Sequence, residues 1–251
     1  YAICGNGAVL TRFSLGDENE HELPGERSVT VPPTLGNHPL VAIREGALSC
    51  CRYLSDVVDI PDTVLFIGMG AFAATDIASI RIPASVAFIG EKAFALTSNL
   101  QSIEVDPSNP FYSSPNGWLT ENGKFDLIRY TSKEKNSSAH IPKSIRFIEK
   151  RAFSGCDISS VIMEEIEGID EGAFMYCSNL TSVKLSDNLR WIKDRAFWRC
   201  PNLTEIEIPQ NVREIGQDVF RDCPPDLVLT VAEGSYAERW ARENGVAYKT
   251  L

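Results

Sequence analysis

The chain has 251 residues, of which 43% are hydrophobic, and a formal net charge of −10 at pH 7. This charge disfavours nucleic acid and anionic lipid as partners, and no run of about 18 apolar residues is present that could span a membrane. No signal peptide precedes Tyr1, as is expected of a mature or trimmed chain, so this does not argue against secretion.

Residues 1–27 predict an N-terminal cap. They contain Gly5 and Gly7, followed by an acidic run at 17–22. We expect a hairpin and then a solvated loop, which together cover the open end of the repeats that follow.

Repeats occupy residues 28–105 and 141–231. A small residue precedes a large one at seven places, which are Ala47-Leu48, Ala71-Phe72, Ala93-Phe94, Ala152-Phe153, Ala173-Phe174, Ala196-Phe197 and Val219-Phe220. The large residues lie 24, 22, 59, 21, 23 and 23 positions apart, so five gaps share one period and the sixth contains an insertion. Such a period is typical of stacked repeats, none of which can bury its apolar face alone.

Each repeat predicts one short strand. Residues 206–208 alternate apolar and polar, and Pro209 ends the strand because proline donates no ladder hydrogen bond. Equivalent strands are expected at 80–82, 103–105, 161–163 and 183–185, and they should pair into a parallel sheet on one face. The large aromatic residues should then be buried in one column, which comprises Phe72, Phe94, Phe153, Phe174, Phe197 and Phe220.

Residues 106–140 interrupt the period. Asn116-Gly117 and Asn122-Gly123 lie between apolar runs, and Asn-Gly in this setting is a strong hairpin signal. The sequence therefore predicts an inserted β-hairpin that projects from the solenoid near its middle.

Residues 232–251 predict a capping helix and tail. Ser235 with Glu238 three positions later forms a capping box, and Gly245 provides the stop. Tyr236 and Trp240 lie one turn apart, so we expect them to cover the exposed core of the last coil.

The cysteines follow the repeat. Five of the seven come three residues after the core Phe or Leu, which are Cys51, Cys156, Cys177, Cys200 and Cys223, and Thr75 and Thr97 take this place in other repeats. This register favours a packing ladder of reduced thiols over disulfides, which remain the alternative. Cys4 and Cys50 lie off the ladder, and either could be paired. No Cys-x-x-Cys pair or histidine spacing indicates a metal site.

The repeat resembles that of a known family. The run Ile-Pro-x-x-Val-x-x-Ile-Gly-x-x-Ala-Phe-x-x-Cys is similar to the leucine-rich repeat of BspA-type bacterial surface proteins over nearly the whole chain, and residues 60–68 and 208–212 fit it closely. The resemblance implies a curved leucine-rich-repeat solenoid, mostly β with irregular or short helical turns, on the bacterial exterior, where adhesion is the usual role. It implies no catalytic residue and no cofactor.

Two faces are candidate binding surfaces. An aromatic residue recurs at one repeat position in Phe66, Phe88, Phe147 and Trp191, with Gly168 and Glu214 breaking the row. We expect a partly exposed aromatic strip, because exposed apolar patches usually mark interaction sites; the alternative is that the hairpin or a second layer buries it. The competing surface is the outer face of the parallel sheet, with serines and mixed charges.

These observations predict a non-catalytic binding or adhesion module of a bacterial secreted or cell-surface protein. Its expected partner is a protein or glycan at the cell exterior, including host extracellular matrix, with no nucleic acid partner and no membrane insertion. One alternative is a structural spacer or stalk that presents another domain. A remote alternative is a hydrolase fragment, although the sequence contains no nucleophile elbow, phosphate loop or paired-carboxylate motif.

Overall fold

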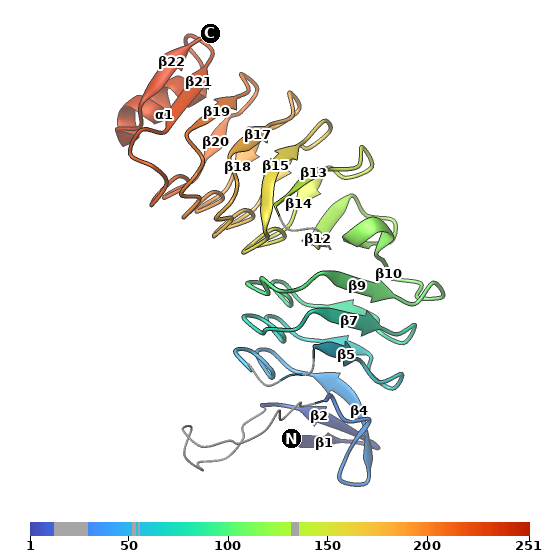
Figure 1. Cartoon of the computed structure of the whole chain (residues 1–251). Coiled ribbons are helices and arrows are strands. Elements are labelled where there is room, and N and C mark those ends of the chain that lie inside the picture. The colour runs from blue at the N-terminus through green and yellow to red at the C-terminus, as the bar shows by residue number, and fades with distance from the viewer. Residues whose placement is uncertain (13–29, 52–53, 55, 132–135) are drawn as a thin grey trace, which may run out of the picture. The chain divides into compact units, whose positions relative to one another are not determined.

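A computed structural model describes residues 1–12, 30–51, 54, 56–131 and 136–251 (Figure 1). The chain divides into two compact units, Tyr1–Asn122 and Gly123–Leu251. In both units a coil contributes a longer strand and a strand of only two residues, and each kind pairs in parallel with its counterpart in the next coil. The fold is therefore a solenoid of mostly β structure, as the repeat predicts, with a second ladder that the sequence did not predict.

The first unit contains both ladders. The longer repeat strands form one sheet, in the order β5 (Val57–Asp59), β7 (Ser79–Ile82) and β9 (Ser102–Val105). The other sheet runs in the order β1 (Ala2–Cys4), β2 (Gly7–Leu10), β4 (His38–Ile43), β6 (Phe66–Ile67) and β8 (Phe88–Ile89), with β3 (Thr34–Leu35) antiparallel to β4. Strands β1 and β2 pair antiparallel, so the predicted N-terminal hairpin is present. The loop predicted after it lies at 13–29, outside the described residues.

The second unit repeats this plan. Its two-residue strands are β14 (Phe147–Ile148), β16 (Gly168–Ile169), β18 (Trp191–Ile192) and β20 (Glu214–Ile215), which pair in this order and follow the longer strand β12 (Asp126–Tyr130) in the same sheet. The longer strands form two short sheets, β13 (Ser137–His140), β15 (Ile158–Ile162) and β17 (Ser182–Lys184), then β19 (Glu205–Ile208), β21 (Val228–Val231) and β22 (Tyr248–Thr250). The strands predicted at 80–82, 103–105, 161–163, 183–185 and 206–208 are all found, and their bounds agree within about one residue except that β15 begins three residues earlier, at Ile158.

The core of each unit is a column of phenylalanines. The six predicted side chains, Phe72, Phe94, Phe153, Phe174, Phe197 and Phe220, are all buried. Ring centroids of successive members lie 4.6 to 5.8 Å apart with nearly parallel planes. The backbone N–H of Phe174 donates to the carbonyl of Ala196 in the next coil at 2.8 Å. A small side chain is needed at Ala196, because the backbones of two coils meet there.

The thiols behave as a packing ladder. Cys156, Cys177 and Cys200 are buried and unpaired, whereas Cys223 is unpaired but only half-buried because it lies near the end of the column. The thiol of Cys177 donates to the carbonyl of Phe153 in the preceding coil at 3.2 Å. The hydroxyl of Thr75, by contrast, bonds back to Phe72 in its own coil at 2.8 Å. Cys50 is an exposed free thiol, and the side chain of Cys4 lies outside the described residues.

The inserted segment contains an antiparallel pair, β10 (Tyr112–Ser113) and β11 (Trp118–Glu121), joined by a 3₁₀ turn at Pro115–Gly117. Buried Asn109 ties it to the repeats, because its side-chain amide donates to the carbonyls of Pro83 and Val86 at 2.8 and 3.0 Å. Further along the chain, β12 pairs in parallel with β14, and β13 pairs in parallel with β15. The end of the inserted segment therefore already belongs to the two ladders of the second unit. The projection of the hairpin stays a prediction.

Helix α1 (Tyr236–Asn244) caps the last coil. The hydroxyl of Ser235 accepts a hydrogen bond from the backbone of Glu238 at 3.2 Å, and Gly245 closes the helix with a left-handed φ of 67°. The ring of Trp240 packs edge-on against Phe220, with centroids 6.1 Å apart. The last ring of the column is therefore shielded from water, as the sequence predicts for Trp240.

Candidate functional site

The short-strand ladder carries the aromatic row predicted from the sequence. Pairing of β6 with β8 places Phe66 opposite Phe88, and the order β14, β16, β18 places Gly168 between Phe147 and Trp191. All four residues occupy one register position, as expected. They form two separate pairs, however, with one pair in each unit.

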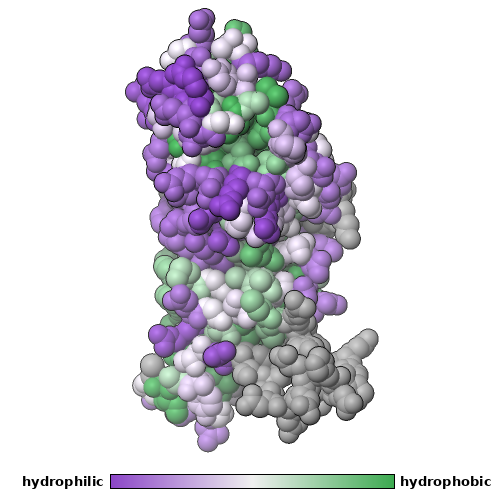
Figure 2. Space-filling view, turned by 90° about the vertical axis from the view of Figure 1, so that its left-hand side faces the viewer, coloured by the Kyte–Doolittle hydropathy of each residue, from purple (hydrophilic) through white to green (hydrophobic). Residues whose placement is uncertain are grey.

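The first pair is the more exposed. Phe66 and Phe88 retain 41% and 46% of their accessible surface, and their rings stack at 4.6 Å with planes 9° apart. Met69 and Leu65 on the same coil as Phe66 are also exposed. Figure 2 shows one face of each unit, and this face is mostly pale or apolar on the first unit and mostly hydrophilic on the second. The rings of the first pair are therefore partly exposed, as expected, and the alternative that the hairpin or a second layer buries them does not hold for this pair.

A shallow cavity of about 470 Å³ opens beside the first pair. We call it the first-unit cavity, and its lining residues are Arg44, Glu45, Phe66, Gly68, Met69, Phe88, Gly90 and Glu91. Gly68 and Gly90 are buried, while the charged residues are exposed and form its rim. A Cβ added at Gly68 would lie 2.4 Å from the backbone nitrogen of Glu45, so glycine is required for two coils to approach so closely here.

The second pair closes over a glycine. Phe147 and Trp191 lie two strands apart, yet their ring centroids are only 5.6 Å apart because the Trp191 ring lies over Gly168, the residue between them. A Cβ at Gly168 would lie 2.2 Å from Cε2 of Trp191, so any other residue would displace the indole. Both aromatic side chains are half-buried. The glycine that breaks the aromatic row in the sequence is thus what allows this pair to form.

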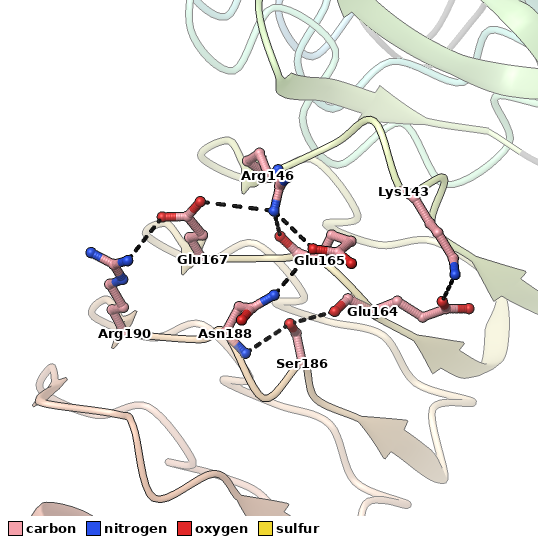
Figure 3. Close-up of polar contacts among 8 residues, drawn as sticks. All are labelled: Lys143, Arg146, Glu164, Glu165, Glu167, Ser186, Asn188 and Arg190. Atoms are coloured by element: carbon pink, nitrogen blue, oxygen red, sulfur yellow. Dashed lines mark hydrogen bonds and ion pairs between the residues drawn. The ribbon is translucent and has the colours of Figure 1, made fainter.

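Ion pairs border the second pair (Figure 3). Arg146 Nη1 lies 2.8 Å from Glu165 Oε2 and 4.0 Å from Glu167 Oε1. Arg190 Nη2 lies 3.7 Å from Glu167 Oε2, and Asn188 donates to Glu165 at 3.1 Å. Each of these carboxylates has a cationic or amide partner from a neighbouring coil. Exposed pairs of this kind add little stability, but they leave this surface with little unbalanced charge.

The same network contains Glu164, which contacts Lys143 Nζ and His140 Nε2, each at 2.7 Å. The hydrogen bond from Lys143, and then that from His140, lower the pKa of Glu164, and the Glu164 contact raises the pKa of Lys143. Both groups are therefore charged and paired at neutral pH. This favours a structural role over general acid–base catalysis, which needs a pKa near the working pH.

The residue that precedes the aromatic position differs between the units. In the first unit it is Leu65 or Ala87, whereas in the second unit it is Arg146, Glu167 or Arg190. The first pair is therefore flanked by apolar side chains and the second by paired charges.

A separate aromatic cluster lies on the loops of the second unit. Tyr176 and Trp198 have ring centroids 5.5 Å apart, and the guanidinium of Arg199 lies 5.5 and 5.1 Å from those rings. The indole N–H of Trp198 and Nε of Arg199 both donate to Asp222 at 3.0 Å. The side chains of this cluster therefore bind one another, and Tyr176 and Trp198 form a group separate from the aromatic row.

The outer face of the sheet of longer strands is polar and internally paired. In the first unit, Arg81 on β7 bridges Asp59 and Glu104 at 3.3 and 3.4 Å. In the second unit, the hydroxyl of Ser160 donates to that of Ser138 at 2.7 Å. This face carries the serines and mixed charges expected, and several of its polar groups bind one another.

No metal or membrane site is found in the part of the chain that the structure describes. Within it, no three histidine, cysteine or acidic residues are grouped so that they could hold a metal ion. No helix among the same residues has the length and apolar character needed to cross a bilayer.

Comparison with known proteins identifies the repeat. The family model described as BspA type leucine rich repeat region matches residues 31–115 and 130–225 in 6 copies. A leucine rich cell surface protein from Faecalibacterium prausnitzii A2-165 is 26% identical, with a TM-score of 0.72, over 86% of this chain and 58% of that chain. The chain therefore spans less than two thirds of that protein's length.

A second similar structure is the pneumococcal vaccine antigen PcpA. It is 19% identical with a TM-score of 0.51, and the match covers 92% of this chain and 78% of that chain. At this identity the likeness concerns the fold alone. No curated protein matches the chain.

Proposed function

The chain belongs to the BspA-type leucine-rich repeat family, and from this we propose that it is a non-catalytic binding module of a bacterial secreted or cell-surface protein. The similar protein from F. prausnitzii is described as a leucine rich cell surface protein, which supports this location. The partner is a protein or a glycan at the cell exterior, host extracellular matrix included. Neither nucleic acid nor insertion into a membrane is part of the proposal.

The observation that carries the proposal is the exposed stacked pair of Phe66 and Phe88 beside the first-unit cavity. Burial of an aromatic ring stabilises a folded protein, because it removes apolar surface from water. Phe66 and Phe88 stay about half-exposed, so part of this stabilisation is missing in the free chain. Aromatic residues are frequent among binding hot spots. A partner that covers both rings would recover this burial.

The competing proposal is that the module is a spacer or stalk that presents another domain. The internally paired sheet face and the ion pairs of the second unit support it, because they offer few unsatisfied groups to a ligand. It does not account for the apolar surface of the first unit. A hydrolase has less support, because the sequence contains no nucleophile elbow, phosphate loop or paired-carboxylate motif.

The folded chain, immobilised through one terminus, should be tested on an array of extracellular-matrix proteins and glycans. We expect at least one class of ligand to be retained. The Phe66→Ser/Phe88→Ser variant should lose that ligand, and the Phe125→Ser variant, which changes another exposed ring, should keep it. Absence of any retained ligand would favour the spacer.

A further inference from the structure

We propose that the first-unit cavity docks an extended protein segment in which an apolar or aromatic side chain is flanked by lysine or arginine. This inference rests on the proposed binding function and narrows it to one unit and one class of partner. It is carried by the chemistry of the cavity lining and by the distribution of charge between the two units.

The cavity lining favours an apolar side chain. Phe66, Met69 and Phe88 provide the apolar part of the lining, and buried glycine backbone lies between them. The two rings stack at 4.6 Å, so the faces that they turn toward each other are covered. The flexible thioether side chain of Met69 can adapt its shape to the side chain that it contacts, and its sulfur makes favourable contacts with aromatic rings.

The same lining favours protein over glycan. Methionine and aromatic residues are enriched in protein–protein interfaces. A segment with one apolar anchor and charged neighbours would place the anchor in the cavity and its neighbours at the rim.

Charge indicates the sign of those neighbours. The first unit has 6 Lys and Arg against 14 Asp and Glu, a net charge of −8, whereas the second has 18 against 20, a net of −2. The rim itself has two carboxylates and one guanidinium. Complementary potential speeds association and suppresses partners of like charge. A cationic segment is therefore favoured, and a second copy of this chain, also with a net charge of −10, is disfavoured.

The second unit does not offer an equivalent site. Phe147 and Trp191 are half-buried and close over Gly168, and the neighbouring carboxylates are already paired with arginine (Figure 3). The aromatic row predicted from the sequence is therefore divided in function. Its first pair binds the partner, and its second pair stabilises the coils.

The test uses the full chain and three short fluorescent peptides, measured by anisotropy. One alternates lysine with phenylalanine, one alternates glutamate with phenylalanine, and one alternates lysine with serine, so that the phenyl rings of an extended peptide share one face. We expect the lysine–phenylalanine peptide to bind most tightly and its affinity to fall with added salt. Equal binding of the glutamate peptide would overturn the charge argument, and equal binding of the serine peptide would overturn the apolar one.

Two variants locate the site. Met69→Ser and Glu45→Lys change an exposed lining residue and a rim charge, and both should weaken the lysine–phenylalanine peptide, Met69→Ser by roughly ten-fold or more. Phe125→Ser is the matched control, because Phe125 is an exposed ring of the second unit. If the control weakens the peptide as much as Met69→Ser does, non-specific adsorption to exposed apolar side chains explains the binding and the docking site is refuted.

The two proposals fail in different ways. If the matrix-protein and glycan array retains a ligand that Met69→Ser and Phe66→Ser leave unaffected, the chain is a binding module that does not use this cavity. If the array retains nothing but the lysine–phenylalanine peptide still depends on Met69 and Glu45, the cavity is a docking site for a partner outside the array.

Discussion

Replacing Phe174 by alanine removes a ring from the middle of the core column. Phe174 is fully buried and stacks on Phe153 at 4.6 Å and on Phe197 at 5.1 Å. Truncating a buried phenylalanine costs about 3–5 kcal/mol, and each aromatic pair contributes about 0.5–1.5 kcal/mol beyond its buried area. Because two stacks are lost, we expect a decrease in unfolding free energy near the upper end of this range, about 5 kcal/mol.

The matched comparison is Phe220→Ala at the end of the column. Phe220 stacks on one phenylalanine only and meets Trp240 edge-on, so its loss should cost about 3 kcal/mol. Phe125→Ala changes an exposed ring and should cost less than about 0.5 kcal/mol. Urea denaturation followed by tryptophan fluorescence measures all three. If Phe174→Ala costs no more than Phe220→Ala, the rings do not act as a continuous stacked column.

Three further predictions concern single contacts. Gly168→Ala should displace the Trp191 indole, seen as a red-shifted fluorescence emission, and an unchanged spectrum would refute the close packing over Gly168. Burial raises the pKa of the Cys177 thiol, so the stability that this thiol contributes is fully present below the thiol pKa of the unfolded chain and falls as the pH rises above it. Cys177→Thr should therefore reduce the loss of urea resistance between about pH 8 and 10. If urea resistance falls equally with pH in both proteins, the thiol is not buried. Hydrogen bonding by Lys143 lowers the pKa of Glu164, so this carboxylate contributes stability that is lost as pH falls through its lowered pKa; Lys143→Ala should raise the Glu164 pKa measured by NMR, and no change would show that the contact is absent in solution.

The repeat made most of the fold predictable. The positions of Phe174 and Pro209 within the period fix which residues turn inward and where the longer strand ends, so its strands, core column and thiol ladder followed from the spacing. The capping helix was predictable because Ser235 and Gly245 are local signals. The second ladder was not predicted, because a strand of two residues is too short to show an alternating pattern.

The candidate site was only partly predictable. Register alone placed Phe66, Phe88, Phe147 and Trp191 in one row, but exposure depends on neighbours that the period does not specify. The repeat pattern contains Gly68 but does not show its role, which is to let two coils meet beside the cavity. The contribution of Met69 was missed for the same reason, since an isolated methionine in one coil gives no repeating signal.

The contact between Phe147 and Trp191 could not be predicted from the sequence either. Trp191 reaches Phe147 across an intervening strand only because the residue between them has no side chain. Such a contact depends on the absence of one side chain in three dimensions, whereas the sequence shows it only as a break in the row.

The most direct test of the binding account is a hydrogen–deuterium exchange footprint of the chain with a ligand retained on the array. The account predicts slowed amide exchange in residues 66–69 and 88–91, which line the first-unit cavity, and unchanged exchange in residues 147–150 and 191–194 of the second unit. Protection of the sheet face at 79–82 and 102–105, with none at the cavity, would contradict it.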